Sequence, residues 1–252
     1  MKIGIIISMY DEIDITHNTI KNIKQYCPII VIQSDPNDPS KTLPENSVDF
    51  YEKLPDLAGS KEDYMKERSD GKGATTPVRA LTRNFRHAFS ASQNFDVDWW
   101  VVILGDVLIT NLDGIKTQIE KIIKNSKSLG VTRAVGQTFM DDDNNPTRTQ
   151  HENTTDFMPQ FFIVNSKLTK NGLFSIFEIT NRFATEQCLG DEVNRYCLKN
   201  NTDFEKICYV ISNYAYPQFI SGLQYNPDRI SMPRYIDGFV NRMRKFRTKY
   251  SK

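Results

Sequence analysis

Residues 98–109 read Asp-Trp-Trp-Val-Val-Ile-Leu-Gly-Asp-Val-Leu-Ile and are the strongest strand signal in the chain. Continuous apolar residues rich in valine and isoleucine are typical of a strand that helices cover on both faces, as in a parallel sheet. Asp106 comes directly after the first part of this run. Ligands of open parallel sheets bind at the carboxyl ends of the strands, so Asp106 is expected at a binding edge.

Two shorter runs of the same kind precede it, in residues 3–9 and 29–32. A segment with helical spacing, residues 16–26, lies between them, and together the three predict a βαβ unit. Further along, the spacing of apolar residues predicts strands at 48–51 and 161–164 and helices at 76–89, 115–123, 173–183 and 191–199. Residues 55–77 and 140–157 are polar and read as loops. The alternation predicts an α/β fold with a mainly parallel central sheet flanked by helices.

The composition is that of an ordinary globular protein, with 39% hydrophobic and 25% charged residues among 252. We expect one domain over residues 1–226, with a nucleotide-binding half at 1–110 and an acceptor half at 111–226, followed by a tail. The first apolar run is too short to span a bilayer, and Asp11 and Glu12 follow it where a leader peptide needs small residues. A cytoplasmic location is therefore expected.

Residues 227–252 hold eight basic and two acidic side chains, whereas the whole chain has a net charge of +1. Their apolar residues fall near helical spacing, which predicts a basic tail helix. Such a helix can lie on an anionic membrane surface, but it can equally pack on the domain. Nucleic-acid binding is not expected, because the rest of the chain is acidic.

The cysteines, at positions 27, 188, 197 and 208, form no Cys-x-x-Cys pair. Their flanking residues are apolar or aromatic, so buried reduced thiols are expected rather than a zinc site or disulfides.

Three predicted strand ends carry polar residues: Tyr10-Asp11-Glu12, Ser34-Asp35 and Gly105-Asp106. A carboxylate at Asp106 suits a magnesium or manganese ion that bridges a diphosphate, and Gly105 lets the backbone approach the phosphates. The alternative is that Asp106 caps the turn that follows its strand.

The order of these motifs resembles the nucleotide-binding half of GT-A-type glycosyltransferases. In that family a Tyr-Asn-Glu-like triplet ends the first strand, here Tyr10-Asp11-Glu12, and an acidic residue ends the second, here Asp35. An Arg-Asn pair opens a helix, here Arg83-Asn84, and a strand with a DxD motif follows about twenty residues later, here Gly105-Asp106-Val107. The expected fold is then a GT-A-like, Rossmann-related sandwich.

The resemblance implies a role for each of these residues. The backbone around Ser8 and Tyr10 and the carboxylate of Asp35 hold the base, with Arg83 or Asn84 beside the base or phosphates. Asp106 meets Mn²⁺ or Mg²⁺ and the diphosphate. Gly105 and Val107 flank it, so this motif supplies a single carboxylate. His151, from a later loop, is a candidate further metal ligand, although a lone histidine in a loop is commonly just solvated.

In the acceptor half, Gly190-Asp191-Glu192 resembles the family's Glu-Asp pair at the start of the helix that carries the catalytic base. Asp191 is the expected base and Glu192 the second choice. The alternative for both is capping of the helix amino terminus, where acidic side chains favour the dipole. Gln160, just before a strand, is expected to touch the transferred sugar.

These residues predict a glycosyltransferase that moves a sugar from a UDP- or dTDP-linked donor to a glycan or lipid-linked glycan hydroxyl, with inversion. A sugar-phosphate nucleotidylyltransferase is the second enzyme hypothesis. It requires a Gly-rich loop with Lys and Arg after the first strand, where this chain has Tyr10-Asp11-Glu12. A catalytically degenerate protein that binds a glycan or a partner is the third.

Overall fold

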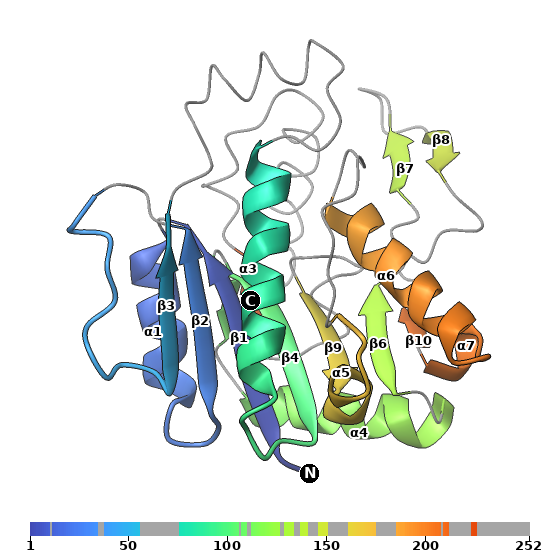
Figure 1. Ribbon diagram of the computed structural model, residues 1–252, viewed down its shortest axis with the longest axis horizontal. Coiled ribbons are helices and arrows are strands. Elements are labelled where there is room, and N and C mark those ends of the chain that lie inside the picture. Colours follow the sequence, from blue (N-terminus) through green and yellow to red (C-terminus); the bar gives the residue numbers. More distant parts are fainter. Residues whose placement is uncertain are drawn as a thin grey trace, which may run out of the picture.

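The computed structural model describes the central sheet, the helices around it and two small strand pairs. The described residues are 1–10, 12–34, 38–55, 76–105, 107–109, 112–126, 129–133, 137–140, 146–150, 161–174, 185–207, 209–211 and 223–225. A seven-stranded sheet in the order β10-β6-β9-β4-β1-β2-β3 forms the centre of the molecule (Figure 1).

Four neighbouring parallel strands make up the first half of the sheet. They are β1 (Ile3–Met9), β2 (Ile29–Ser34), β3 (Phe50–Leu54) and β4 (Trp99–Leu104). β1 lies between β2 and β4, and the pairs Ile7 with Val31 and Ile7 with Ile103 fix the register. The strand order therefore reverses between β1 and β4, and such a switch point opens a crevice at the carboxyl ends of the strands.

The second half of the sheet contains one reversed strand. β9 (Phe161–Asn165) pairs antiparallel with both β4 and β6 (Gly130–Arg133), and β10 (Tyr209–Ile211) adds to β6 in parallel. β1, β2, β3, β4, β6 and β10 therefore share one direction, and their carboxyl ends lie at the top of Figure 1.

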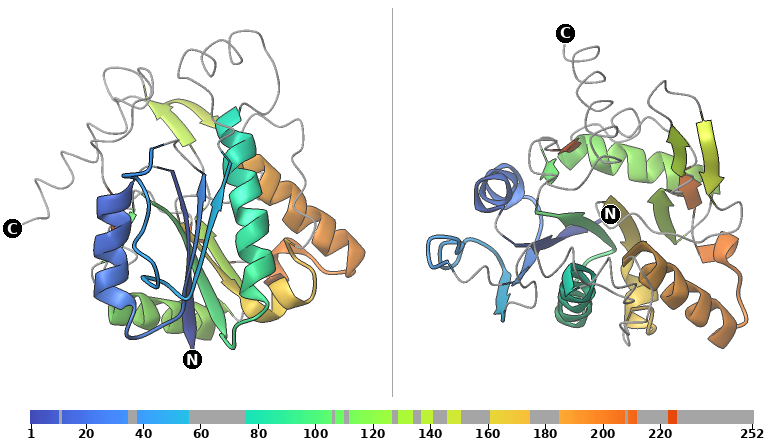
Figure 2. Two further views of the ribbon diagram at one scale, coloured as in Figure 1. Left: turned by 60° about the vertical axis from the view of Figure 1, so that its left-hand side comes forward. Right: turned by 90° about the horizontal axis from the view of Figure 1, so that it is seen from above.

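Helices cover both faces of the sheet, which makes a three-layer α/β/α sandwich (Figure 2). One face carries α1 (Ile13–Ile23) and α4 (Leu112–Ser126). The other carries α3 (Thr76–Ser92), α5 (Ser166–Lys170), α6 (Thr185–Lys199) and α7 (Phe204–Ile207). The predicted α/β class with a mainly parallel sheet is confirmed.

Alternate residues of each central strand enter two separate cores. On β1, Ile6 packs with Phe85 and Phe89 of α3, whereas Ile5 and Ile7 pack toward α1 and α4. All of these side chains are buried. Because a residue in a strand contacts only one face, this double burial explains why the strand sequences are continuously apolar.

The strongest strand signal divides into two strands. β4 ends at Leu104, and β5 (Val107–Ile109) leaves the main sheet to pair antiparallel with β11 (Leu223–Tyr225). The strand end predicted at Gly105-Asp106 is therefore confirmed, and the rest of the run forms a second strand that belongs to another sheet. The reading of residues 140–157 as loop is wrong in part, because β8 (Pro146–Gln150) pairs with β7 (Gln137–Met140).

Other element boundaries differ from the expected ones. The third strand begins at Phe50 instead of Val48. Residues 171–174, where a helix was expected to begin, form a turn, and Phe174 has a positive φ of 63°. The helix expected at 191–199 begins at Thr185.

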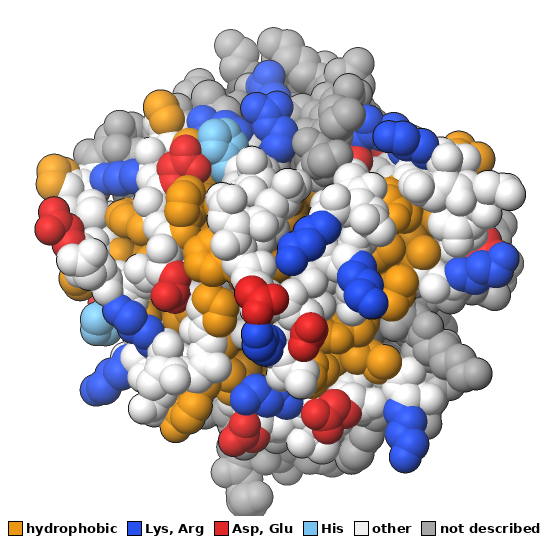
Figure 3. Space-filling model, turned by 60° about the horizontal axis from the view of Figure 1, so that its bottom comes forward, with side chains coloured by type: hydrophobic (Ala, Val, Ile, Leu, Met, Phe, Trp, Pro, Cys, Tyr) orange, Lys and Arg blue, Asp and Glu red, His pale blue; other side chains and the backbone are white. Residues whose placement is uncertain are grey.

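None of the described helices combines the length and apolarity that a membrane crossing needs. The face seen in Figure 3, near the amino ends of the parallel strands, mixes basic and acidic side chains. Cys27, Cys188 and Cys197 are free and buried, as predicted, and Cys208 lies outside the described residues.

Candidate nucleotide site at the carboxyl edge of the sheet

The carboxyl ends of β1 and β4 are joined directly at the switch point. The backbone N–H of Gly105 donates a hydrogen bond of 2.8 Å to the carbonyl of Ser8. Gly105 also lies so close to β1 that a Cβ at this position would be 2.7 Å from Cβ of Met9. The missing side chain therefore lets the two strand ends approach each other.

Asn84 connects the ends of β1 and β2 on the α3 side of the sheet. Its Nδ2 donates to Oγ of Ser8 at 3.1 Å, and its Oδ1 accepts from Oγ of Ser34 at 3.1 Å. All three side chains are buried. Because a buried hydroxyl without a partner is costly, this set fixes the two strand ends relative to helix α3. Asn84 thus attaches the ends of β1 and β2 to α3.

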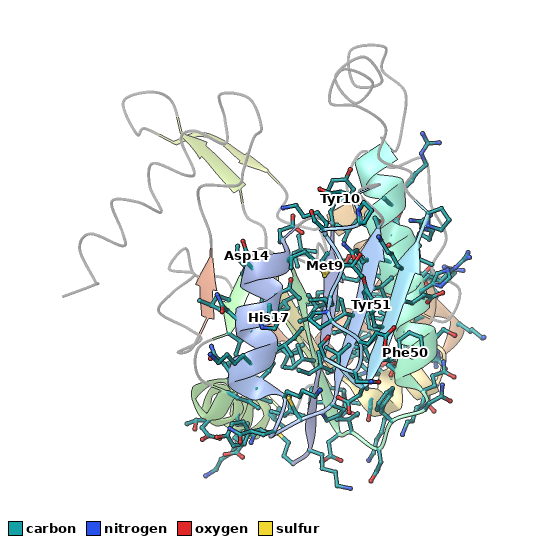
Figure 4. The ribbon with its side chains drawn as sticks, turned by 90° about the vertical axis from the view of Figure 1, so that its left-hand side faces the viewer. Met9, Tyr10, Asp14, His17, Phe50 and Tyr51 are labelled. Carbon is teal, nitrogen blue, oxygen red and sulfur yellow. The ribbon has the colours of Figure 1, made fainter. Side chains whose placement is uncertain are left out.

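Glu12 closes the turn that follows β1. Its Oε2 accepts a hydrogen bond of 2.8 Å from the backbone N–H of Tyr10 and lies 2.9 Å from the place where a Cβ of Gly105 would be. This carboxylate therefore sits between the ends of β1 and β4. Tyr10 lies above Met9 at the carboxyl edge (Figure 4).

Gln33 is the corresponding link on the α1 side of the sheet. It is fully buried, and its Nε2 donates to the carbonyls of Tyr10 at 2.8 Å and Lys41 at 2.6 Å. Its Oε1 accepts a hydrogen bond from the hydroxyl of Tyr51 on β3. One side chain thus joins the end of β1, the loop after β2 and β3.

The loop after β2 is shaped by a local turn. Oδ1 of Asp38 accepts from the backbone N–H of Ser40 at 2.9 Å and from its hydroxyl at 2.7 Å. These hydrogen bonds lower the pKa of the Asp38 carboxyl. Its ionised form is therefore favoured near the binding edge.

Arg83 lies next to Asn84 on α3 but contacts the end of β3. Its Nη2 donates to the carbonyl of Pro55 at 2.7 Å. One turn later on the same helix, Nδ1 of His87 lies 3.0 Å from Oε2 of Glu52 on β3. These contacts attach α3 to the edge of the sheet. The structure brings Ser8, Tyr10, Asn84 and Gly105 together, and Arg83 lies toward β3.

Asp191 and Glu192 are the seventh and eighth residues of α6, so they lie beyond its first turn. The capping alternative is wrong for both, because the unpaired N–H groups of a helix belong to its first turn. Glu192 is buried and forms an ion pair with Arg195, whereas Asp191 is more exposed. Of the two carboxylates, Asp191 is the better placed to meet a substrate.

Four of the expected site residues, Asp35, Asp106, His151 and Gln160, lie outside the described residues. Within the described ranges, no three His, Cys, Asp or Glu side chains converge as a metal site. Glu12 nevertheless places a hard oxygen donor against Gly105, and carboxylate oxygens suit Mg²⁺ or Mn²⁺. This edge is thus chemically compatible with either ion.

Sequence reasoning missed Gln33 as part of the site, and it named Glu12 and Ser34 only within motifs. A signal for Gln33 exists in the sequence, because an amide directly after the four β-branched residues at 29–32 must find partners inside the protein. Ser34 carries the same signal.

No family model matches the sequence, and no curated protein matches it. Solved structures do resemble the fold. A mannosyltransferase, PcManGT from Pyrobaculum calidifontis in complex with GDP-Man and Mn²⁺, matches with a TM-score of 0.42 and 10% identity over 84% of this chain and 55% of its own. A glycosyltransferase involved in the glycosylation of the major capsid of PBCV-1 matches with a TM-score of 0.43 and 14% identity, over 97% of this chain and 100% of its own. CMP:2-keto-3-deoxy-manno-octonic acid synthetase complexed with CTP matches with a TM-score of 0.42 and 8% identity, over 84% of this chain and 91% of its own.

These matches concern the arrangement of the chain alone. The chain spans about half the length of the mannosyltransferase. Nothing about donor, acceptor or mechanism follows from these matches.

Proposed function

We propose that this protein is a glycosyltransferase that moves a sugar from a UDP- or dTDP-linked donor to a hydroxyl of a glycan or lipid-linked glycan, with inversion. The observation that carries the proposal is the joining of three strand ends at the switch point. The Gly105–Ser8 hydrogen bond joins β4 to β1, and Asn84 joins β1 to β2. Nucleotides bind at such points in open parallel sheets.

The donor lies across this edge in the proposed complex. The backbone at Ser8 and Tyr10 holds the base, and Asp35 accepts a hydrogen bond from a uracil or thymine N–H. The diphosphate lies beside Gly105 and Asp106. Mn²⁺ or Mg²⁺, when bound, would be held by Asp106 and His151 and would offset the charge of the diphosphate.

Transfer then requires a base for the acceptor. The acceptor oxygen forms a bond to the anomeric carbon, the bond from that carbon to the diphosphate oxygen breaks, and the acceptor proton passes to the Asp191 carboxylate. Gln160 contacts the sugar. Glu192 is buried and Asp191 is half-buried, so the greater exposure of Asp191 favours it as the base.

Calorimetry with UDP-glucose and MnCl₂ tests the nucleotide site. We expect Asp106→Asn to abolish binding. Asp203→Asn, which removes the same charge beside α7, is the matched control and leaves binding intact, because the contacts of Asp203 are a hydrogen bond from the N–H of Lys206 and an ion pair with the same lysine. Equal affinity of Asp106→Asn and wild type would overturn the assignment of Asp106.

A UDP-release assay with an oligosaccharide panel tests the base. Asp191→Asn is expected to keep donor affinity and lose turnover, whereas Glu192→Gln keeps turnover. The reverse result assigns the base to Glu192. Full activity of both variants would remove α6 from the mechanism.

The nucleotidylyltransferase alternative predicts pyrophosphate release from UTP and a sugar 1-phosphate. The turn after β1 disfavours it, because Tyr10-Asp11-Glu12 stands where that class needs a Gly-rich loop with Lys and Arg. A wild-type protein that binds UDP-glucose but turns over neither substrate set supports the non-catalytic alternative.

A further inference from the structure

Side chains of helix α1 form a row of hydrogen bonds to the backbone of residues 105–109. Thr16 Oγ1 donates to the carbonyl of Gly105 at 3.4 Å, and Asn22 Nδ2 donates to the carbonyl of Ile109 at 3.0 Å. Between them, Thr19 Oγ1 donates to the carbonyl of Val107 at 3.3 Å and accepts from the N–H of Ile109 at 3.1 Å.

These side chains lie three residues apart and therefore on one face of the helix. Thr16 and Thr19 are buried, and they share that face with Ile20 and Ile23. A buried hydroxyl stabilises the fold only when it is hydrogen-bonded, so this polar row has a definite partner. That partner is the open edge of β5, whose other edge pairs with β11.

The row has its effect on both sides of position 106. The N–H of Gly105 is bound to Ser8 and its carbonyl to Thr16, while the carbonyl of Val107 is bound to Thr19. The residues directly before and after Asp106 are thus held by β1 and α1. The backbone of these two residues therefore loses little entropy when a ligand binds against it.

We propose that Thr16 and Thr19 are positioning residues that hold the backbone around Asp106 ready for a nucleotide diphosphate. This inference rests on the function proposed above. It predicts that loss of the hydroxyls weakens the binding of UDP-glucose with MnCl₂ in protein that is still folded.

Calorimetry on the full chain tests this with Thr19→Val, which keeps the shape of the side chain and removes two hydrogen bonds. We expect affinity for UDP-glucose with MnCl₂ to fall roughly tenfold, as hydrogen bonds of ordinary strength allow. Thr19→Ser restores the hydroxyl and is expected to bind within about twofold of wild type. Thr16→Val, which loses one bond, gives a smaller loss and serves if Thr19→Val fails to fold.

Thr82→Val is the matched control. Thr82 is buried in α3, and its hydroxyl has no hydrogen-bond partner among the described residues. This variant is therefore expected to keep wild-type affinity. Thermal melts of all variants separate a loss of stability from a loss of affinity.

The possible failures are distinguishable. Wild-type affinity in Thr19→Val and Thr16→Val, together with no binding by Asp106→Asn, overturns the positioning role and leaves the proposed function standing. Absence of nucleotide binding by the wild type overturns both. Equal weakening by Thr19→Ser and Thr19→Val would show that the hydroxyl is not the cause.

Discussion

The indole ring of Trp100 occupies the space that a side chain at Gly4 would need. The two residues are register partners on β1 and β4, and a Cβ at position 4 would lie 2.4 Å from Cζ3 of Trp100. This is far below a carbon–carbon contact distance of about 3.5–4.0 Å. The large side chain of Trp100 therefore fits only because position 4 is a glycine.

Gly4→Ala is therefore expected to destabilise the protein by about 1–3 kcal/mol, because the ring is fully buried and has no room to move. Urea unfolding followed by tryptophan fluorescence measures the change. In a Trp100→Leu background the same substitution is expected to cost less, since the ring is gone. An equal cost in both backgrounds contradicts this account.

Asn84→Leu is expected to cost about 1–3 kcal/mol, because the hydroxyls of Ser8 and Ser34 lose their common partner in the core. Chemical denaturation measures this loss. Ser8→Ala and Ser34→Ala are the companion variants, and each is expected to cost less in the Asn84→Leu background than alone. Strict additivity of the three substitutions would show that they do not act as one network.

Gln33→Met keeps the length of the side chain and removes all three of its hydrogen bonds. We expect faster hydrogen exchange in residues 38–43 and a loss of about 1–3 kcal/mol, because the partly buried carbonyls of Tyr10 and Lys41 lose the donor that Gln33 supplies. Tyr51→Phe removes only the bond from the Tyr51 hydroxyl and is the milder comparison. Unchanged hydrogen exchange in residues 38–43 would show that Gln33 does not hold the conformation of this loop.

Burial raises the pKa of the Cys27 thiol to about 12, and its Sγ donates to the carbonyl of Ile23 at 3.7 Å. Native protein is thus expected to resist iodoacetamide at Cys27 at pH 8–9, since the thiolate is the nucleophile. Between the unfolded pKa near 9 and about 12, only the unfolded chain loses the proton, so stability falls as pH rises. Mass spectrometry locates the label, and a shallower high-pH slope in Cys27→Ala checks the linkage.

The centre of the fold was predictable because its strands are buried on both faces. Ile5, Ile6 and Ile7 are all buried, so an unbroken run of apolar residues is enough to indicate the strand. Residues 107–109 are equally apolar and also form a strand, but they pair with a strand more than a hundred residues away, which the sequence did not indicate. Strand partners at that distance leave no local signal.

β8 was missed for the complementary reason. Its sequence, Pro-Thr-Arg-Thr-Gln, has no apolar alternation, and its pairing with β7 determines its conformation. The start of α6 was misplaced because Thr185 to Gly190 has a weak apolar pattern and contains a glycine.

The site was predictable where it depends on strand ends. Ser8, Tyr10 and Gly105 follow from the rule that ligands bind at the carboxyl edge, and the structure brings all three to that edge. Gln33 and Thr19 could not be ranked from the sequence, because their importance comes from partners that only the folded chain supplies.

The reversed strand β9 has a consequence for how this edge can change. Phe161 pairs with Ile103 near the end of β4, so the chain enters the sheet through β9 at the edge from which β1, β2 and β4 leave it. Insertions before Phe161 can therefore lengthen the rim without altering any crossover between parallel strands. One reversal of direction gives the fold an evolutionary route to a longer rim that leaves the parallel strands unchanged.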